Sequence, residues 1–170
     1  MKLITTLFIS LFLITQVQAQ DSAEVIMNKA MQKAQKEKKN ILLKYGASWC
    51  TWCKKMDQKI KSTTCKSLFE KNYVIVNLTV FEPSRNKHLE NSGASELLEK
   101  QNGTTAGLPF WVILDNKGKV LEDCFNSSNQ NLGCPKAPSE IQQFIDKIKR
   151  TSKLSQKELD MITAEFKRRH

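Results

Sequence analysis

The sequence has 170 residues, of which 40% are hydrophobic and 26% are charged, and its 27 Lys and Arg exceed its 17 Asp and Glu. This length accommodates one domain with a short appendage, and the hydrophobic fraction is enough for a buried core. The composition and the lack of repeats exclude a collagen, a coiled coil and a polytopic membrane protein. The five cysteines cannot all pair within one chain, and they are too few for a disulfide-dense miniature scaffold.

Residues 1–19 are predicted to be a secretory signal peptide. Lys2 precedes an apolar run that ends at Ile14, and this run is shorter than the roughly 20 residues that span a bilayer. Ala19 then provides a small residue directly before a cleavage site ahead of Gln20. An uncleaved membrane anchor is the alternative. We expect a periplasmic or secreted protein that is not inserted in the membrane after cleavage, and we expect disulfides to persist there.

The remaining chain is predicted to alternate helices and strands around a mixed sheet. Hydrophobic periodicity of the helical kind marks residues 22–38, 50–62, 95–101 and 139–150, and a short helical turn follows Thr64. Buried strands are predicted at 41–45, 73–80, 110–114 and 119–125, the last two as a hairpin around residues 116–118, whereas 81–93 is predicted as a loop. The expected fold class is therefore α/β.

Residues 20–150 are predicted to form this domain, and residues 151–170 a C-terminal helical extension. Ser155 and Glu158 form a predicted capping box at the start of the extension, and Ser139 and Gln142 form a similar one for the preceding helix. We expect the last helix to pack on the domain. A helix that binds a partner is the alternative.

Cys50 and Cys53 lie three residues apart where a strand is followed by a helix. The unpaired N–H groups at a helix start favour a thiolate at Cys50, and the thiolate is the nucleophile in disulfide exchange. Cys53, expected one turn deeper, can then attack a mixed disulfide formed at Cys50. A structural disulfide is an alternative. A zinc site is disfavoured because only His88 and His170 could supplement the cysteines, and haem attachment would need a His where Lys54 stands.

This segment resembles the thioredoxins. Residues 41–50 (ILLKYGASWC) are similar to the stretch that leads into the thioredoxin active site, and 107–110 (GLPF) resemble the loop that carries the family's cis-proline. Residues 110–120 resemble its terminal hairpin, so the likeness spans about 22–150. It implies a thioredoxin-like fold, Cys50 as the attacking and Cys53 as the resolving cysteine, a cis bond before Pro109, and Leu108 pairing its backbone with substrate. A trans Pro109 is the alternative.

Two positions depart from the thioredoxin pattern. Lys44 stands where thioredoxins commonly have a buried acid, so a role for Lys44 in tuning the thiols is expected in place of the usual acid-base assistance. Thr51-Trp52 between the cysteines matches none of the common dipeptides. Trp49 and Trp52 are predicted to present an apolar rim to a polypeptide, and packing of Trp52 against its own helix is the alternative.

The other three cysteines receive different predictions. Cys124 and Cys134 flank a polar loop, and a structural disulfide between them would restrain that loop. Two free thiols or a second redox pair are the alternatives. Cys65 is expected to be a buried, unreactive thiol, and a third redox thiol or an intermolecular bridge are the alternatives.

The functional prediction is a protein-disulfide oxidoreductase, whose direction of electron flow the sequence leaves open. Its partners would be protein thiols and disulfides together with a redox partner, and no cofactor, no metal and a monomer are expected. The scattered lysines carry no nucleic-acid motif, so nucleic acid is not an expected partner. A thioredoxin-fold module that binds a partner without catalysis is the alternative.

Overall fold

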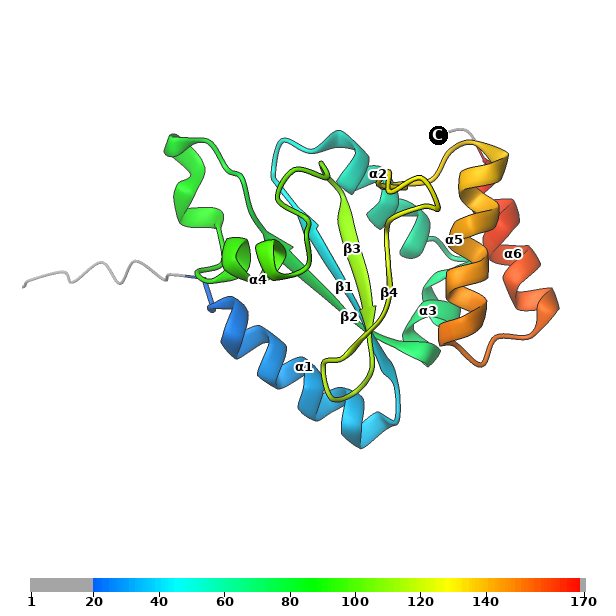
Figure 1. Ribbon diagram of the computed structural model, residues 1–170. Coiled ribbons are helices and arrows are strands. Elements are labelled where there is room, and N and C mark those ends of the chain that lie inside the picture. The colour runs from blue at the N-terminus through cyan, green and yellow to red at the C-terminus, as the bar shows by residue number, and fades with distance from the viewer. Residues whose placement is uncertain (1–19, 169–170) are drawn as a thin grey trace, which may run out of the picture.

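The computed structural model describes residues 20–168, so the predicted signal peptide, residues 1–19, lies outside the described residues. Helices and strands alternate along the chain, as the sequence predicts (Figure 1). The elements are α1 (Ala23–Glu37), β1 (Asn40–Gly46), α2 (Thr51–Ile60), α3 (Lys66–Asn72), β2 (Tyr73–Thr79), the 3₁₀ helix η1 (Ser84–Leu89), α4 (Ala94–Lys100), β3 (Phe110–Leu114), β4 (Val120–Asp123), α5 (Pro138–Thr151) and α6 (Gln156–Lys167).

The four strands form one mixed sheet in the order β2-β1-β3-β4. β1 runs parallel to β2 and antiparallel to β3, and β3 forms a hairpin with β4. In the hairpin turn the Asp115 Oδ1 atom accepts hydrogen bonds from the N–H groups of Lys117 and Lys119, at 2.8 and 2.9 Å. Gly118 has a φ of 88°, in the left-handed region that glycine adopts at little cost. The predicted α/β class with a mixed sheet is confirmed.

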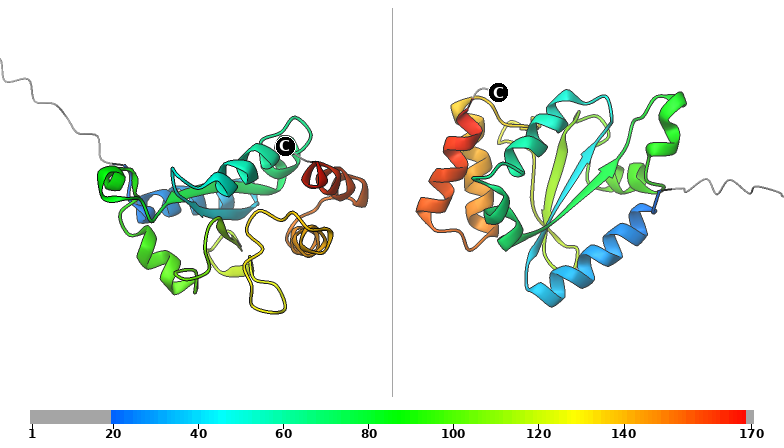
Figure 2. Two further views of the ribbon diagram at one scale, coloured as in Figure 1. Left: turned by 90° about the horizontal axis from the view of Figure 1, so that it is seen from above. Right: turned by 180° about the vertical axis from the view of Figure 1, so that it is seen from behind.

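Helices cover both faces of the sheet, which explains why its central strands are apolar almost throughout. Every residue of β3 is buried, and so are residues 41–45 of β1. Figure 2 shows α2 and α3 on one face and α4 on the other. The start of α1 is held to the segment directly before α4 by a hydrogen bond from the Ala23 N–H to the Ser92 carbonyl, 2.8 Å long. No helix among residues 20–168 is long and apolar enough to cross a bilayer.

The last two helices lie side by side beyond the β4 edge of the sheet (Figures 1 and 2). Phe144 of α5 contacts Trp111 of β3, with ring centroids 5.4 Å apart, and Phe166 of α6 at 4.9 Å. Such ring pairs add about 0.5–1.5 kcal/mol each to the burial of their area. The C-terminal helix is therefore part of the packed structure, as predicted.

The two predicted capping boxes have different outcomes. At α6 the Ser155 N–H donates to Glu158 Oε2 at 2.8 Å, and the Glu158 N–H donates to Ser155 Oγ at 3.4 Å, which confirms that box. The prediction for α5 was wrong, because this helix begins earlier, at Pro138. Proline is well suited to the first helical position, and Glu140 then accepts the N–H of Ala137, 2.9 Å away.

Candidate active site

Cys50 and Cys53 form a disulfide at the start of α2, directly beyond the end of β1. Cys50 is the N-cap residue of α2, and its Sγ atom accepts the N–H of Cys53 at 3.1 Å. The first turn of the helix contains no acidic residue. The open N–H groups of a helix start stabilise negative charge, so this position favours a thiolate at Cys50 once the disulfide is reduced.

The depth of the two cysteines differs from the prediction. Cys50 is only 4% exposed, whereas Cys53 is half-buried and lines a cavity of about 270 Å³. Cys53 packs instead against the backbone of Gly46, where an added Cβ would lie 3.3 Å from the Cys53 Sγ atom. Cys53 therefore lies beside the cavity and close to β1, whereas Cys50 is buried.

Lys44 lies in the same cavity and is buried, with 4% of its surface exposed. Its ammonium forms an ion pair with Asp57, which comes from the next turn of α2 after Cys53. Burial lowers the pKa of Lys44, and the carboxylate of Asp57 partly offsets this effect. Sequence reasoning identified Lys44 but missed its partner, although Asp57 stands four residues after Cys53, on the same face of the helix.

The loop that carries Pro109 meets the cysteines because of the strand register. Tyr45 pairs with Phe110 in the antiparallel β1–β3 ladder. The C-terminal end of β1 and the N-terminal end of β3 therefore lie at the same end of the sheet. The Leu108–Pro109 peptide bond is cis, and Pro109 lines the cavity that contains Cys53. In residues 20–168, neither the N–H nor the carbonyl of Leu108 takes part in a backbone hydrogen bond.

Asn131 holds this loop in place, a role that sequence reasoning missed. Its Nδ2 atom lies 3.1 Å from each of three carbonyl oxygens, those of Ala106, Gly107 and Pro109, and donates to them. Its Oδ1 atom accepts the N–H of Gly133 at 2.7 Å. The polar loop between residues 124 and 134 therefore anchors the Pro109 loop. Nothing in the local sequence distinguishes Asn131 from its polar neighbours.

The segment 81–93, predicted as a loop, supports the residues just before Cys50. Glu82 is buried and accepts hydrogen bonds from the Ser48 N–H and from the Ser48 hydroxyl, the latter at 2.7 Å. Burial alone would raise the pKa of Glu82, but these hydrogen bonds hold it below its usual value. The Trp49 Nε1–H donates to the Phe81 carbonyl at 2.8 Å. Both contacts join residues that are far apart in sequence, so no local sequence pattern predicts them.

The two predicted rim tryptophans are exposed. Trp49 is 56% exposed and Trp52 is 44% exposed. The Lys55 ammonium lies 4.7 Å from the centroid of the Trp52 ring, and the Lys136 ammonium lies 5.9 Å from it. Trp52 also lines a second cavity of about 620 Å³ together with Leu108 and Pro109. Trp52 therefore lies at the surface beside the Pro109 loop.

The remaining three cysteines are free and buried. The predicted disulfide between Cys124 and Cys134 is absent from this structure, which corrects that expectation. Both side chains are buried in the hydrophobic core. Burial raises the pKa of Cys124 to about 12 and that of Cys134 to about 11. Cys65 is fully buried as predicted, and burial raises the pKa of its thiol as well.

No group of three or more His, Cys, Asp or Glu side chains in the described part of the chain is placed to hold a metal ion.

Comparison with known proteins adds a family and several structures. The model of a family described as thioredoxin-like matches residues 23–116. Among curated proteins, none matches this chain. A disulphide isomerase from Xylella fastidiosa Temecula1 is 24% identical, with a TM-score of 0.50 over 64% of this chain and 75% of its own.

Two further solved structures are similar at lower scores. A protein described as DsbH oxidoreductase is 23% identical, with a TM-score of 0.49 over 82% of this chain and 90% of its own. The C-terminal domain of DsbD from Neisseria meningitidis, in its oxidised form, is 19% identical, with a TM-score of 0.46 over 78% of this chain and 99% of its own.

Proposed function

The chain belongs to the thioredoxin-like family, and we propose that it is a protein-disulfide oxidoreductase that exchanges disulfides with exported polypeptides through Cys50 and Cys53. The observation that carries this proposal is the Cys50–Cys53 disulfide at the start of α2, beside the Pro109 loop. A disulfide that only stabilised the fold would not need a helix start, an adjacent cavity and an open backbone edge.

The proposed reduction of a client takes two steps. The Cys50 thiolate attacks one sulfur of the client disulfide, and the client's other sulfur leaves as a thiolate that takes up a proton. The Cys53 thiolate then attacks the Cys50 sulfur, the bond between Cys50 and the client breaks, and the Cys50–Cys53 disulfide forms. Two electrons pass to the client, which leaves with two thiols. Oxidation of a client is the same sequence in reverse, and a separate redox partner restores the pair in either direction.

Lys44 and Asp57 are proposed to tune the resolving step. Both line the cavity that contains Cys53, and they form an ion pair there. The ammonium of Lys44 favours the Cys53 thiolate by charge attraction, and the carboxylate of Asp57 opposes it. Thioredoxins commonly have an acid at the position of Lys44. In this protein β1 therefore contributes a positive charge to the site instead of a negative one.

The client is proposed to bind as an added strand along Leu108. The Leu108 N–H and carbonyl are free of backbone hydrogen bonds within the described chain, and Trp52 lies across the same cavity. An extended peptide can pair with such an open backbone, because every peptide unit carries one donor and one acceptor. This mode tolerates many side chains, as a protein with several clients requires.

Export to the periplasm or beyond is part of this proposal. It rests on the expectation that residues 1–19 are a signal peptide, and on the need for a compartment in which disulfides persist. In such a compartment the protein meets polypeptides as they emerge unfolded with reactive thiols.

The reduction of insulin by dithiothreitol, followed by turbidity, tests the function. We expect Cys50→Ser to remove the catalysed rate, a loss of about 1,000-fold or more, because no nucleophile remains. Cys53→Ser should accumulate mixed disulfides that are visible on a non-reducing gel. Cys65→Ala is the matched control, since this cysteine is fully buried elsewhere. Undiminished activity of Cys50→Ser would contradict the mechanism.

A redox titration separates this function from that of a binding module, the second candidate, which the exposed Trp49 and Trp52 favour. A pair that equilibrates with glutathione or dithiothreitol supports exchange chemistry. A pair that stays oxidised in a large excess of dithiothreitol would favour the binding module.

A further inference from the structure

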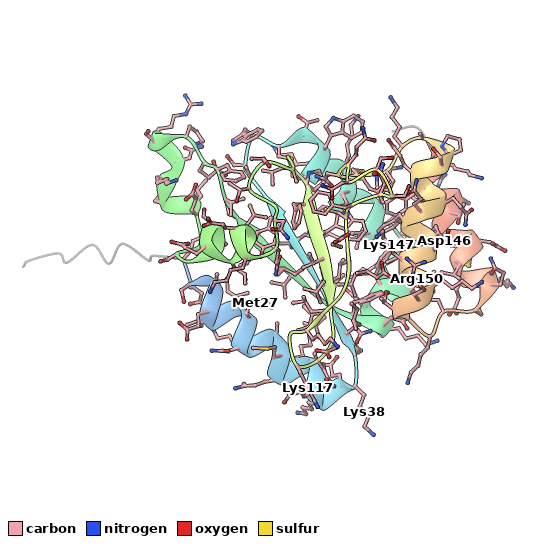
Figure 3. All side chains as sticks on the ribbon, in the orientation of Figure 1. Met27, Lys38, Lys117, Asp146, Lys147 and Arg150 are labelled. Atoms are coloured by element: carbon pink, nitrogen blue, oxygen red, sulfur yellow. A yellow bond between two sulfur atoms is a disulfide. The ribbon has the colours of Figure 1, made fainter. Side chains whose placement is uncertain are left out.

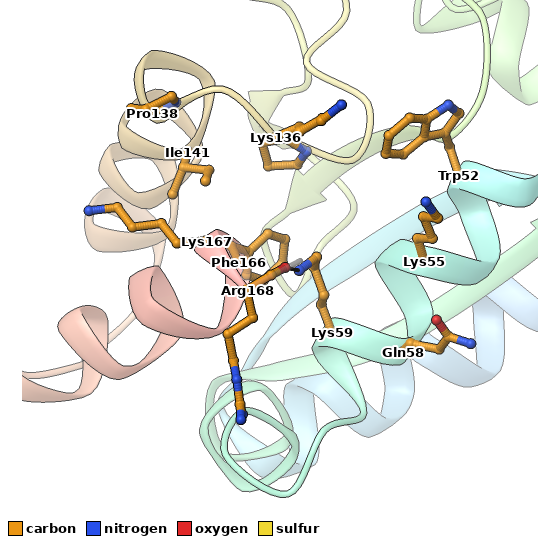
Figure 4. Close-up of a pocket in the computed structure, with 11 residues that line it drawn as sticks. Trp52, Lys55, Gln58, Lys59, Lys136, Pro138, Ile141, Phe166, Lys167 and Arg168 are labelled. Atoms are coloured by element: carbon orange, nitrogen blue, oxygen red, sulfur yellow. Dashed lines mark hydrogen bonds between the residues drawn. The ribbon is translucent and has the colours of Figure 1, made fainter. Parts of the chain in front are cut away.

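A basic groove lies next to the redox site, between α2, the segment that leads into α5, and the end of α6. It encloses about 580 Å³, and its walls carry the side chains of Trp52, Lys55, Lys59, Lys136, Phe166 and Lys167, among others (Figure 4). The end of α6 forms one wall. The helical extension beyond residue 150 therefore contributes to a surface that continues from the active site.

The lining of the groove is strongly basic. Five of its lining residues are basic and none is acidic. Arg168 is neutralised by an ion pair with Glu165, 3.2 Å away. Lys59 is used internally, because its ammonium donates to the carbonyls of Glu165 and Arg168, at 3.1 and 2.9 Å. In contrast, the ammonium groups of Lys55, Lys136 and Lys167 form no ion pair with any described residue.

Aromatic rings lie among these charges. Lys55 and Lys136 lie over the Trp52 ring, and Lys59 lies 5.7 Å from the centroid of Phe166. The rings hold the ammonium groups near one another, even though like charges repel at this range. An anionic occupant would relieve that repulsion, and an apolar side chain could rest on the rings. The groove thus suits a segment that has both carboxylates and side chains that can contact rings.

The groove is continuous with the proposed client edge. Trp52 and Lys136 line it, and both also line the cavity that contains Leu108 and Pro109. A polypeptide paired with Leu108 that continues past Trp52 therefore enters the groove. A concave path that joins an open backbone edge fits an extended chain better than it fits the broad, flat surface of a membrane.

We propose that this groove binds an acidic segment of the client polypeptide, close in sequence to the client's reactive cysteine. The proposal rests on the exchange function proposed above and adds a substrate class to it. Complementary charge mainly accelerates encounter and selects among partners, and its effect declines as salt screens it.

Two synthetic peptides test this inference. Each contains the same single intramolecular disulfide, followed by four Glu in one peptide and by four Gln in the other. The measured quantity is the second-order rate constant for exchange with the fully reduced protein, followed by tryptophan fluorescence in low salt. We expect the Glu peptide to react about 5–20 times faster than the Gln peptide, and this ratio to fall toward 1 in 0.5 M NaCl.

Two triple variants with the same net charge show whether the preference for the Glu peptide comes from the groove. The triple variant Lys55→Gln, Lys136→Gln, Lys167→Gln should bring the Glu/Gln ratio below about 3. The control removes three exposed lysines from α1, α4 and the hairpin turn, through Lys36→Gln, Lys100→Gln and Lys117→Gln. It should retain the ratio of the parent protein, because only the net charge of the chain has changed.

The outcomes separate the two proposals. Equal rates for both peptides with the parent protein would overturn the acidic-segment proposal and leave the exchange function standing. Equal loss of the ratio in both triple variants would also overturn it, because net charge alone would then explain the preference. Reaction with neither peptide would overturn the exchange function as well. Equal peptide rates combined with groove-dependent binding to vesicles containing 30% phosphatidylserine would assign the groove to a membrane instead.

Discussion

The five cysteines occupy two kinds of surroundings, and exposure does not distinguish them. Cys50 is 4% exposed and Cys134 is 8% exposed, so both are buried. Cys50, however, caps α2 and accepts an N–H from the helix, whereas burial raises the pKa of Cys134 to about 11. The comparison teaches that the groups around a sulfur, more than its depth, decide whether it forms a thiolate.

The largest expected difference between the two groups is the rate of alkylation. At pH 7 a thiol with a pKa of about 11 is a thiolate for a fraction on the order of 10⁻⁴ of the time. We expect iodoacetamide to modify Cys50 of the reduced protein at least about 100 times faster than Cys124 or Cys134, as measured by mass spectrometry of peptides. Comparable rates at all sites would break the comparison.

The same method counts the free thiols of the oxidised protein. After denaturation without reduction we expect three labelled cysteines: Cys65, Cys124 and Cys134. A single labelled cysteine would show that Cys124 and Cys134 pair after all.

A smaller effect is expected from the charges beside Cys53. Lys44→Met removes an ammonium that favours the thiolate form, so the disulfide should become harder to reduce, by about 30 mV, which is tenfold in the equilibrium constant. Asp57→Asn should shift the potential in the opposite direction, because it removes the opposing charge. Equilibration with glutathione measures both potentials. Shifts in the same direction for both variants would indicate a structural effect instead of the charge.

The smallest expected effect concerns β4, the strand that directly precedes Cys124. Glu122 of β4 pairs with Lys147 and Arg150, which project from α5 (Figure 3). Burial alone would raise the pKa of Glu122, but the hydrogen bonds from these two residues hold it below the usual value of 4.5. The unfolded chain therefore binds this proton more readily, so the stabilisation is complete above about pH 4.5 and is lost as the pH falls through the lower pKa of the folded state.

Glu122→Gln is therefore expected to lower the free energy of unfolding by about 1 kcal/mol at pH 7, and by less at pH 3. Urea unfolding followed by circular dichroism measures both values. Glu99→Gln, at an exposed position of α4, provides a control with the same chemical change. An equal loss at both pH values would show that packing, and not charge, accounts for the contribution of Glu122.

The sequence predicted the fold well because the signals of its elements are local. Apolar runs mark β1 and β3, and the helical spacing of apolar residues marks α5. The cysteine pair was likewise visible, since Cys50 and Cys53 are close in sequence. The contacts that complete the site are not local: Glu82 reaches Ser48, and Asn131 reaches the Pro109 loop, across 34 and 22 residues. One sequence contains no signal for such distant pairs.

The errors have physical reasons as well. The polar loop between Cys124 and Cys134 suggested a disulfide, but the structure has both as free, buried thiols, and sequence spacing does not reveal how side chains are oriented. The relative depth of Cys50 and Cys53 is set by tertiary packing, such as the close approach of Gly46 to Cys53, and local sequence patterns do not contain such contacts.

The amide of Asn131 has a thermodynamic consequence for any client. Fixing the backbone of one residue costs about 1–2 kcal/mol in conformational entropy. Because Asn131 holds the carbonyls of Ala106, Gly107 and Pro109, the loop beside Leu108 loses this freedom when the protein folds. An arriving polypeptide then meets a receptor edge that is already ordered, and only the polypeptide itself loses freedom on docking.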